Sequence, residues 1–108
     1  MYTKKVVDGY FIKTVSYDRN LKYCPYGSAG VDIGYEHLYL KSYTTLVLAL
    51  NTKNGWLECT GTYSATTRKH IAAFLKEYAP SLHYYDVKGA YEHNLQINIH
   101  TGATRPLP

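Results

Sequence analysis

The chain has few of the residues from which catalytic and metal sites are usually built. It has two cysteines, Cys24 and Cys59, and no Cys-x-x-Cys, which argues against a zinc site on paired cysteines. Its five histidines form no His-Glu-x-x-His and no helical i, i+4 pair, so metal ligands would have to come from distant strands. Its eight acidic residues are scattered, and Gly-x-Ser-x-Gly, phosphate-loop and Gly-x-Gly-x-x-Gly motifs are missing. We therefore expect no catalytic residue, metal or cofactor, although a small enzyme with an unrecognised site stays an alternative.

Long hydrophobic runs are missing as well. No apolar stretch approaches the length that crosses a bilayer, and the first residues lack the apolar region of a signal peptide. We therefore expect a cytoplasmic protein without a membrane partner, in which Cys24 and Cys59 are free thiols.

Phenylalanine and tryptophan are scarce, with two and one residues, whereas tyrosine occurs 13 times. Tyrosine has an apolar ring and a polar tip, so it can lie between a core and solvent. Two interpretations stay open: tyrosine is the large strand residue of a small β-rich core, or it forms a binding surface. As candidates for a partner surface we take Tyr23, Tyr26 and Tyr35.

Basic residues exceed acidic ones, and the 108 residues carry a formal net charge of +4. This balance favours polyanionic partners such as nucleic acid. The cations are dispersed, and the densest cluster is Arg68-Lys69-His70.

The periodicity predicts an α+β fold in a single domain, residues 1–108: an antiparallel sheet of about four to six strands with one main helix on one face. The helix is expected over 65–78, because Ile71, Phe74, Leu75 and Tyr78 recur with helical spacing and Pro80 ends the pattern.

Alternating residues predict the strands, and glycines and asparagines predict the turns. A strand pair joined through Asn54-Gly55 is expected from the apolar run 44–50 and the residues 56–60. Further strand-like segments are 4–16, 82–88 and 95–99. The residues 17–35 are expected to form a long loop, and 101–108 a tail without regular structure.

The first turn of the expected helix carries hydroxyls and cations where helices normally have acidic residues. Backbone N–H groups with such side chains suit a phosphate or a carboxylate. The candidate anion or partner site consists of Ser64, Thr66, Thr67, Arg68, Lys69 and His70. The alternative is helix capping by Ser64 or Thr66 with an ordinary solvated basic face.

The segment Tyr63-Ser-Ala-Thr-Thr-Arg-Lys-His-Ile71, followed by Phe74, has the pattern Tyr-Ser-x-Thr-Thr-x-x-His-Ile-x-x-Phe. In this pattern the chain resembles small uncharacterised proteins of Gram-positive bacteria, their phages and their plasmids. The resemblance implies no catalytic role for any residue. It implies an accessory protein of a mobile element, of the kind that binds nucleic acid or a host complex.

We therefore expect a small, basic, tyrosine-rich protein that binds nucleic acid or a nucleic-acid-containing complex without catalysis. The alternative is an inhibitor that binds a host protein, such as a CRISPR-Cas or other defence nuclease. A homodimer through an exposed strand edge or a tyrosine patch stays open.

Overall fold

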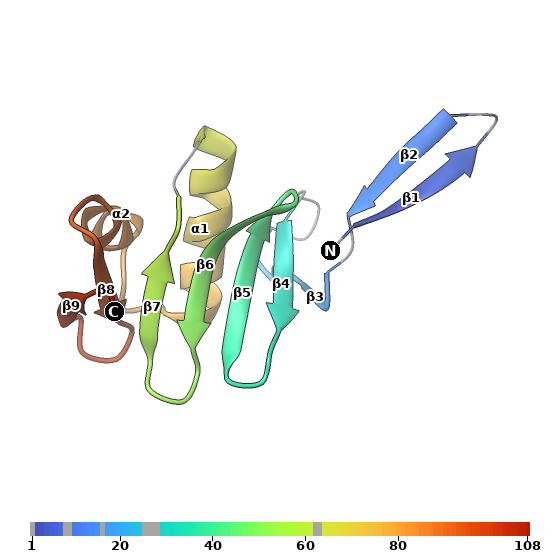
Figure 1. The fold of residues 1–108 in the computed structure, drawn as a ribbon. Coiled ribbons are helices and arrows are strands. Elements are labelled where there is room, and N and C mark those ends of the chain that lie inside the picture. Colours follow the sequence, from blue (N-terminus) through green and yellow to red (C-terminus); the bar gives the residue numbers. More distant parts are fainter. Residues whose placement is uncertain (1, 8–9, 16, 25–28, 62–63) are drawn as a thin grey trace.

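Two helices cover one face of a seven-stranded antiparallel sheet in the computed structural model (Figure 1). The structure describes residues 2–7, 10–15, 17–24, 29–61 and 64–108. For the first two of these ranges, it describes the backbone only. The sheet strands follow one another in chain order: β3 (Arg19–Asn20), β4 (Ala29–Ile33), β5 (His37–Ser42), β6 (Thr45–Asn51), β7 (Trp56–Cys59), β8 (Leu95–Asn98) and β9 (Thr104–Pro106). The helices α1 (Ala65–Tyr78) and α2 (Tyr84–Glu92) lie between β7 and β8 in the chain.

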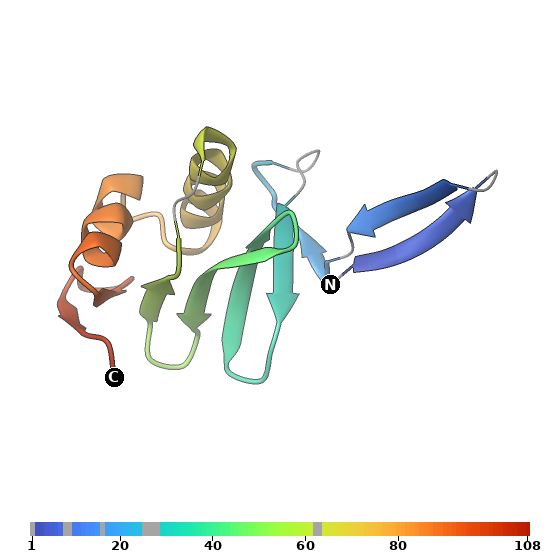
Figure 2. The ribbon, with the colours of Figure 1, turned by 45° about the horizontal axis from the view of Figure 1, so that its top comes forward.

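A separate antiparallel hairpin is formed by β1 (Tyr2–Val7) and β2 (Tyr10–Val15), with Tyr2 opposite Val15 and Val7 opposite Tyr10. It stands apart from the seven-stranded sheet in both ribbon views (Figures 1 and 2). The segment 4–16, which was expected to be strand-like, thus forms two strands.

The α+β fold and its main helix were predicted correctly. The helix α1 has the expected bounds, and the side chains of Ile71, Phe74 and Leu75 are buried against the sheet. Ser64 begins the helix, since its Oγ accepts a hydrogen bond from the backbone N–H of Thr67 at 3.2 Å. The apolar stripe therefore docks the helix.

The expected hairpin from β6 to β7 is also present. Leu50 pairs with Leu57 and Leu48 with Cys59. In the turn, Asn51 Oδ1 accepts the backbone N–H groups of Lys53 and Asn54. Gly55 has a φ of +81°, which a glycine adopts at little cost.

The expected strand at 82–88 is wrong, because Tyr84 begins the second helix. A capping box starts this helix: Asp86 Oδ2 accepts from the backbone N–H of His83, and His83 Nδ1 accepts from the N–H of Tyr85. Histidine replaces the usual serine or threonine of a capping box, which hid the signal. The sheet consequently carries two helices on one face where one was expected.

Two segments expected to lack regular structure contain strands. The expected loop 17–35 contains β3 and β4, and β4 pairs with β5 along its whole length. The tail contains β9, which pairs with β8 at the sheet edge, with Leu95 opposite Pro106. Proline is tolerated on such an outer strand. These strands raise the number in the sheet to seven, above the expected four to six.

Candidate binding surface

The hydroxyl groups at the start of α1 are used mainly inside the protein. Ser64 Oγ caps the helix and lies 3.2 Å from Thr67 Oγ1. Thr67 is buried, and its Oγ1 is also 3.2 Å from Ser42 Oγ on β5. Thr66, by contrast, is exposed. Of the three expected anion-binding hydroxyls, that of Thr67 is therefore buried and that of the exposed Ser64 caps the helix, while Thr66 is exposed.

His70 belongs to the same internal cluster. Its side chain is 2% exposed, and Nδ1 lies 2.8 Å from Ser42 Oγ. Burial lowers the pKa of His70 below its ordinary value, because the charged imidazolium loses its hydration. A serine and a histidine at this distance could form a nucleophile–base pair. Here both are buried between β5 and α1, and the groove described below is not lined by either, so the pair joins helix to sheet.

Arg68 and Lys69 are exposed on α1, and two tyrosines of α2 hold the arginine in place. The Arg68 guanidinium carbon lies 5.1 Å from the ring centres of both Tyr84 and Tyr85. Arg68 Nη2 donates a hydrogen bond of 2.6 Å to Tyr85 Oη. A cation over an aromatic ring is attracted to the ring and keeps its positive charge. No local sequence signal points to these two tyrosines, because they are 16 and 17 residues away from Arg68.

A second group of cations and tyrosine lies on the other side of α1. Lys76 Nζ is 4.5 Å and Lys22 Nζ 5.5 Å from the ring centre of Tyr23, which is 44% exposed. The backbone N–H of Lys22 donates to Glu77 Oε1 at 2.8 Å, which ties this segment to the helix. Tyr23, predicted as a partner residue, thus lies beside α1. We call the two groups together with Lys69 the basic helical surface; it consists of Lys22, Tyr23, Arg68, Lys69, Lys76, Tyr84 and Tyr85.

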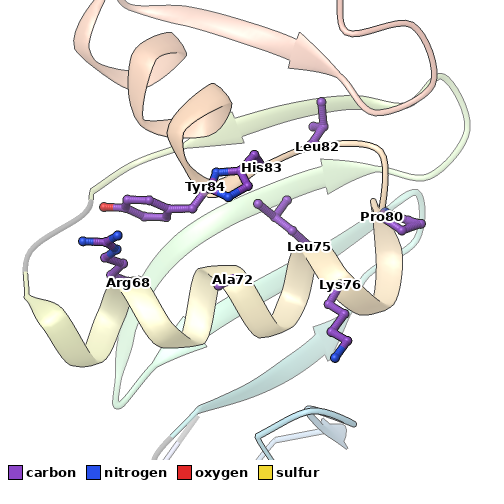
Figure 3. Close-up of a pocket in the computed structure, with 8 residues that line it drawn as sticks. All are labelled: Arg68, Ala72, Leu75, Lys76, Pro80, Leu82, His83 and Tyr84. Atoms are coloured by element: carbon purple, nitrogen blue, oxygen red, sulfur yellow. The ribbon is translucent and has the colours of Figure 1, made fainter.

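A groove of about 390 Å³ runs between α1 and α2 within this surface (Figure 3). Arg68 extends from α1 towards Tyr84, whereas Lys76 points to the opposite side of the helix. The residues that line it are Arg68, Ala72, Leu75, Lys76, Pro80, Leu82, His83 and Tyr84. Apolar side chains therefore lie between two cations.

Two lysines of the sheet and its turns, by contrast, lie beside carboxylates. Lys41 forms an ion pair with Asp32. Arg105 Nε donates to Gln96 Oε1 at 2.8 Å, and its guanidinium carbon lies 4.1 Å from the ring centre of Trp56. Lys53 Nζ, in the β6–β7 turn, lies 3.7 Å from Glu36 Oε1. Among the side chains that the structure describes, the two lysine–carboxylate pairs are the ion pairs, and neither involves a cation of α1.

The remaining predicted partner residues lie elsewhere. Tyr35 is in the turn between β4 and β5 and is 99% exposed. Tyr26 lies outside the described residues. The structure thus brings Tyr23, Arg68 and Lys69 to the sides of one helix and leaves Tyr35 apart from them.

Both thiols are reduced in this arrangement. Cys59 is buried, and this burial raises the pKa of its thiol to about 11. Cys24 is half-buried. Among the side chains that the structure describes, no three of the types His, Cys, Asp and Glu lie close enough to hold a metal ion. None of the described helices has the length and apolar character needed to cross a membrane.

Comparison with curated proteins gives no match, and comparison with solved structures gives none either. A family profile does match, and it covers residues 9–88, which include β2 to β7, α1 and the start of α2. The chain therefore belongs to a family that is described as a family of unknown function, DUF8033.

Proposed function

We propose that this protein binds nucleic acid, alone or within a larger complex, through the basic helical surface and without catalysis. The observation that carries this proposal is which groups lie beside each cation. On α1, Arg68 and Lys76 lie against tyrosine rings and Lys69 is exposed, whereas Lys41 on β5 and Lys53 in the β6–β7 turn lie beside carboxylates.

This difference matters because phosphate contacts require cations that are not already neutralised. Each Lys or Arg that contacts a phosphate releases condensed counterions from the nucleic acid, so binding weakens steeply as salt rises. Exposed tyrosines beside the cations, such as Tyr23 and Tyr85, add flat surfaces on which bases can stack. The surface combines both contributions.

The test removes two cations of α1. We expect the double variant Lys69→Gln/Lys76→Gln to bind labelled DNA and RNA more weakly and to reduce the slope of log K against log salt by about two, one per lost phosphate contact. Both side chains are exposed, so the melting temperature should stay near that of the unmodified protein.

The matched control is Lys53→Gln/Arg105→Gln, which removes the same charge from the β6–β7 turn and from β9. It should leave the salt slope nearly unchanged. Equal losses in both double variants would show that net charge alone drives binding. Absence of salt-dependent binding to any nucleic acid would refute the proposal.

Tyr35 favours a second candidate function, binding of a host protein such as a defence nuclease. The side chain is 99% exposed at the turn between β4 and β5, two residues after Ile33, which is 50% exposed. Exposed aromatic residues of this kind serve as anchors in protein interfaces. Capture of a host protein that survives nuclease treatment, and that is lost in Tyr35→Ala, would favour this function over nucleic-acid binding.

A further inference from the structure

We propose that the groove between α1 and α2 receives an unpaired base, so that the ligand of this protein is a single-stranded nucleic acid. This inference rests on the proposed function and specifies its substrate class. It follows from three features: the apolar lining of the groove, the positions of the cations around it, and a small residue on the helix between them.

The lining of the groove is suited to a flat, apolar group. Leu75 is 2% exposed, and Leu82, Pro80 and Ala72 lie beside it. A double helix presents phosphates and groove edges and keeps its bases stacked inside, so it cannot place a base on these side chains. A single strand can turn its bases outwards, and proteins that read single strands use aromatic and arginine planes for this purpose. Arg68, which lies over the Tyr84 ring, provides such a plane beside the groove.

The cations are placed for phosphates on both sides of a bound base. Arg68 and Lys76 are eight residues apart, about 12 Å along the helix axis. Arg68 reaches towards α2, whereas Lys76 points to the other side of α1 (Figure 3). There the Lys76 Nζ lies over the ring of Tyr23. A strand that joins them has to cross the helix near Ala72, halfway between the two cations. Ala72 is exposed and small, so a sugar-phosphate backbone can approach α1 closely there.

The occupant is therefore expected to be anionic along its length and flat and apolar at intervals. An acidic polypeptide is anionic along its length, but it does not present flat bases. A duplex is anionic as well, but its bases are stacked inside. We assign the groove to a single strand because exposed tyrosines lie at both ends of this path, Tyr85 beside Arg68 and Tyr23 beside Lys76. A second base can stack on Tyr23, which is 44% exposed.

The test compares ligands that share phosphates but differ in their bases. The affinity of the full chain is measured at fixed salt for oligothymidylate, for oligouridylate, for an abasic strand and for a duplex, all of the same length. We expect at least one of the two single strands to bind about tenfold more tightly than the abasic strand and the duplex, in the range that one base stacked on an aromatic ring contributes. The oligouridylate arm separates RNA from DNA, and preference for either supports the proposal.

The variant Ala72→Leu fills the groove while it keeps every cation. Because Ala72 is exposed on a helix and leucine is a good helix former, the fold should tolerate the change. We expect the preference for bases to disappear and the affinity for the abasic strand to stay. Ala65→Leu makes the same substitution at an exposed position of α1 that does not line the groove, and it should keep the preference.

Three results would overturn the inference. Equal affinity for oligothymidylate, oligouridylate and the abasic strand would exclude the base site, while salt-dependent binding of all three would leave the proposed function standing. If Ala65→Leu and Ala72→Leu lost the preference for bases equally, the groove would be excluded as the site of the base. Binding of polyglutamate as tight as that of the single strands would assign the groove to an acidic polypeptide. Failure of every nucleic acid to bind would instead refute the proposed function itself.

Discussion

Ser42 Oγ lies 2.8 Å from His70 Nδ1, and both side chains are closed off from solvent between β5 and α1. Thr67 Oγ1 completes the cluster at 3.2 Å from the same serine. Buried polar groups are costly unless they are hydrogen-bonded to one another. This cluster therefore fixes the position of the helix whose outer side carries Arg68, Lys69 and Lys76.

The stability of the protein should decrease in mild acid because of His70. Burial lowers the pKa of this imidazole in the folded state, so the unfolded state takes up a proton first, near pH 6.5. The contribution of His70 is complete above pH 6.5, and it is lost progressively as the pH falls from 6.5 towards the lower folded pKa. Urea unfolding at pH 7.5, 6.5 and 5.5 measures the change. The pH dependence of the free energy of unfolding should flatten in His70→Gln. It should persist in the control His100→Gln, which replaces an exposed histidine. A wild-type protein that is equally stable at pH 7.5 and pH 5.5 would contradict this role of His70.

Neighbouring threonines on α1 should differ sharply in their importance for stability. Thr67→Val keeps the shape of the side chain but removes the hydroxyl that bonds to Ser42, and we expect a loss of about 1–3 kcal/mol in the free energy of unfolding. Thr66→Val makes the same change at an exposed position, where a change within about 0.5 kcal/mol is expected. Both variants retain a β-branched residue, so helix propensity does not separate them. Denaturant titration of the two proteins gives the comparison, and equal values would mean that the cluster contributes little.

The core assignment is tested with Phe74, which is fully buried with its ring centre 4.8 Å from that of Tyr78. Phe74→Ala should lower the free energy of unfolding by about 3–5 kcal/mol, because it removes buried apolar surface and leaves a cavity. The control is Tyr35→Ala, which removes an aromatic ring that is 99% exposed and should change stability by no more than about 0.5 kcal/mol. A Phe74→Ala protein as stable as the control would contradict the docking of α1 on the sheet.

The sequence was sufficient for α1 because its signals are local. Ser64 caps the helix and the buried stripe recurs within 14 residues, so both can be recognised without knowledge of the rest of the chain. The second helix was missed because tyrosine and valine favour strands and because a histidine–aspartate pair forms its capping box. The tyrosines around Arg68 could not be predicted either, since packing of α2 beside α1 brings them there. The inward direction of Thr67 likewise depends on Ser42, which is 25 residues away.

Two glycines should respond to alanine in opposite directions. A Cβ on Gly30 would lie 2.3 Å from Tyr17 Cγ and 2.5 Å from Tyr17 Cβ. These atoms lie at the base of the side chain, so the whole ring has to move, and the hydrogen bond from Tyr17 Oη to the carbonyl oxygen of Tyr43 is put under strain. We expect Gly30→Ala to lower the free energy of unfolding by about 1–3 kcal/mol, as overpacking usually does.

Gly89 lies inside α2 with no atom within 4 Å of the added Cβ, so Gly89→Ala should stabilise the protein by about 0.5–1 kcal/mol through helix propensity. Melting temperatures of the two variants should therefore lie on either side of the wild type, and a shift of both in the same direction would contradict the packing of Tyr17 on Gly30.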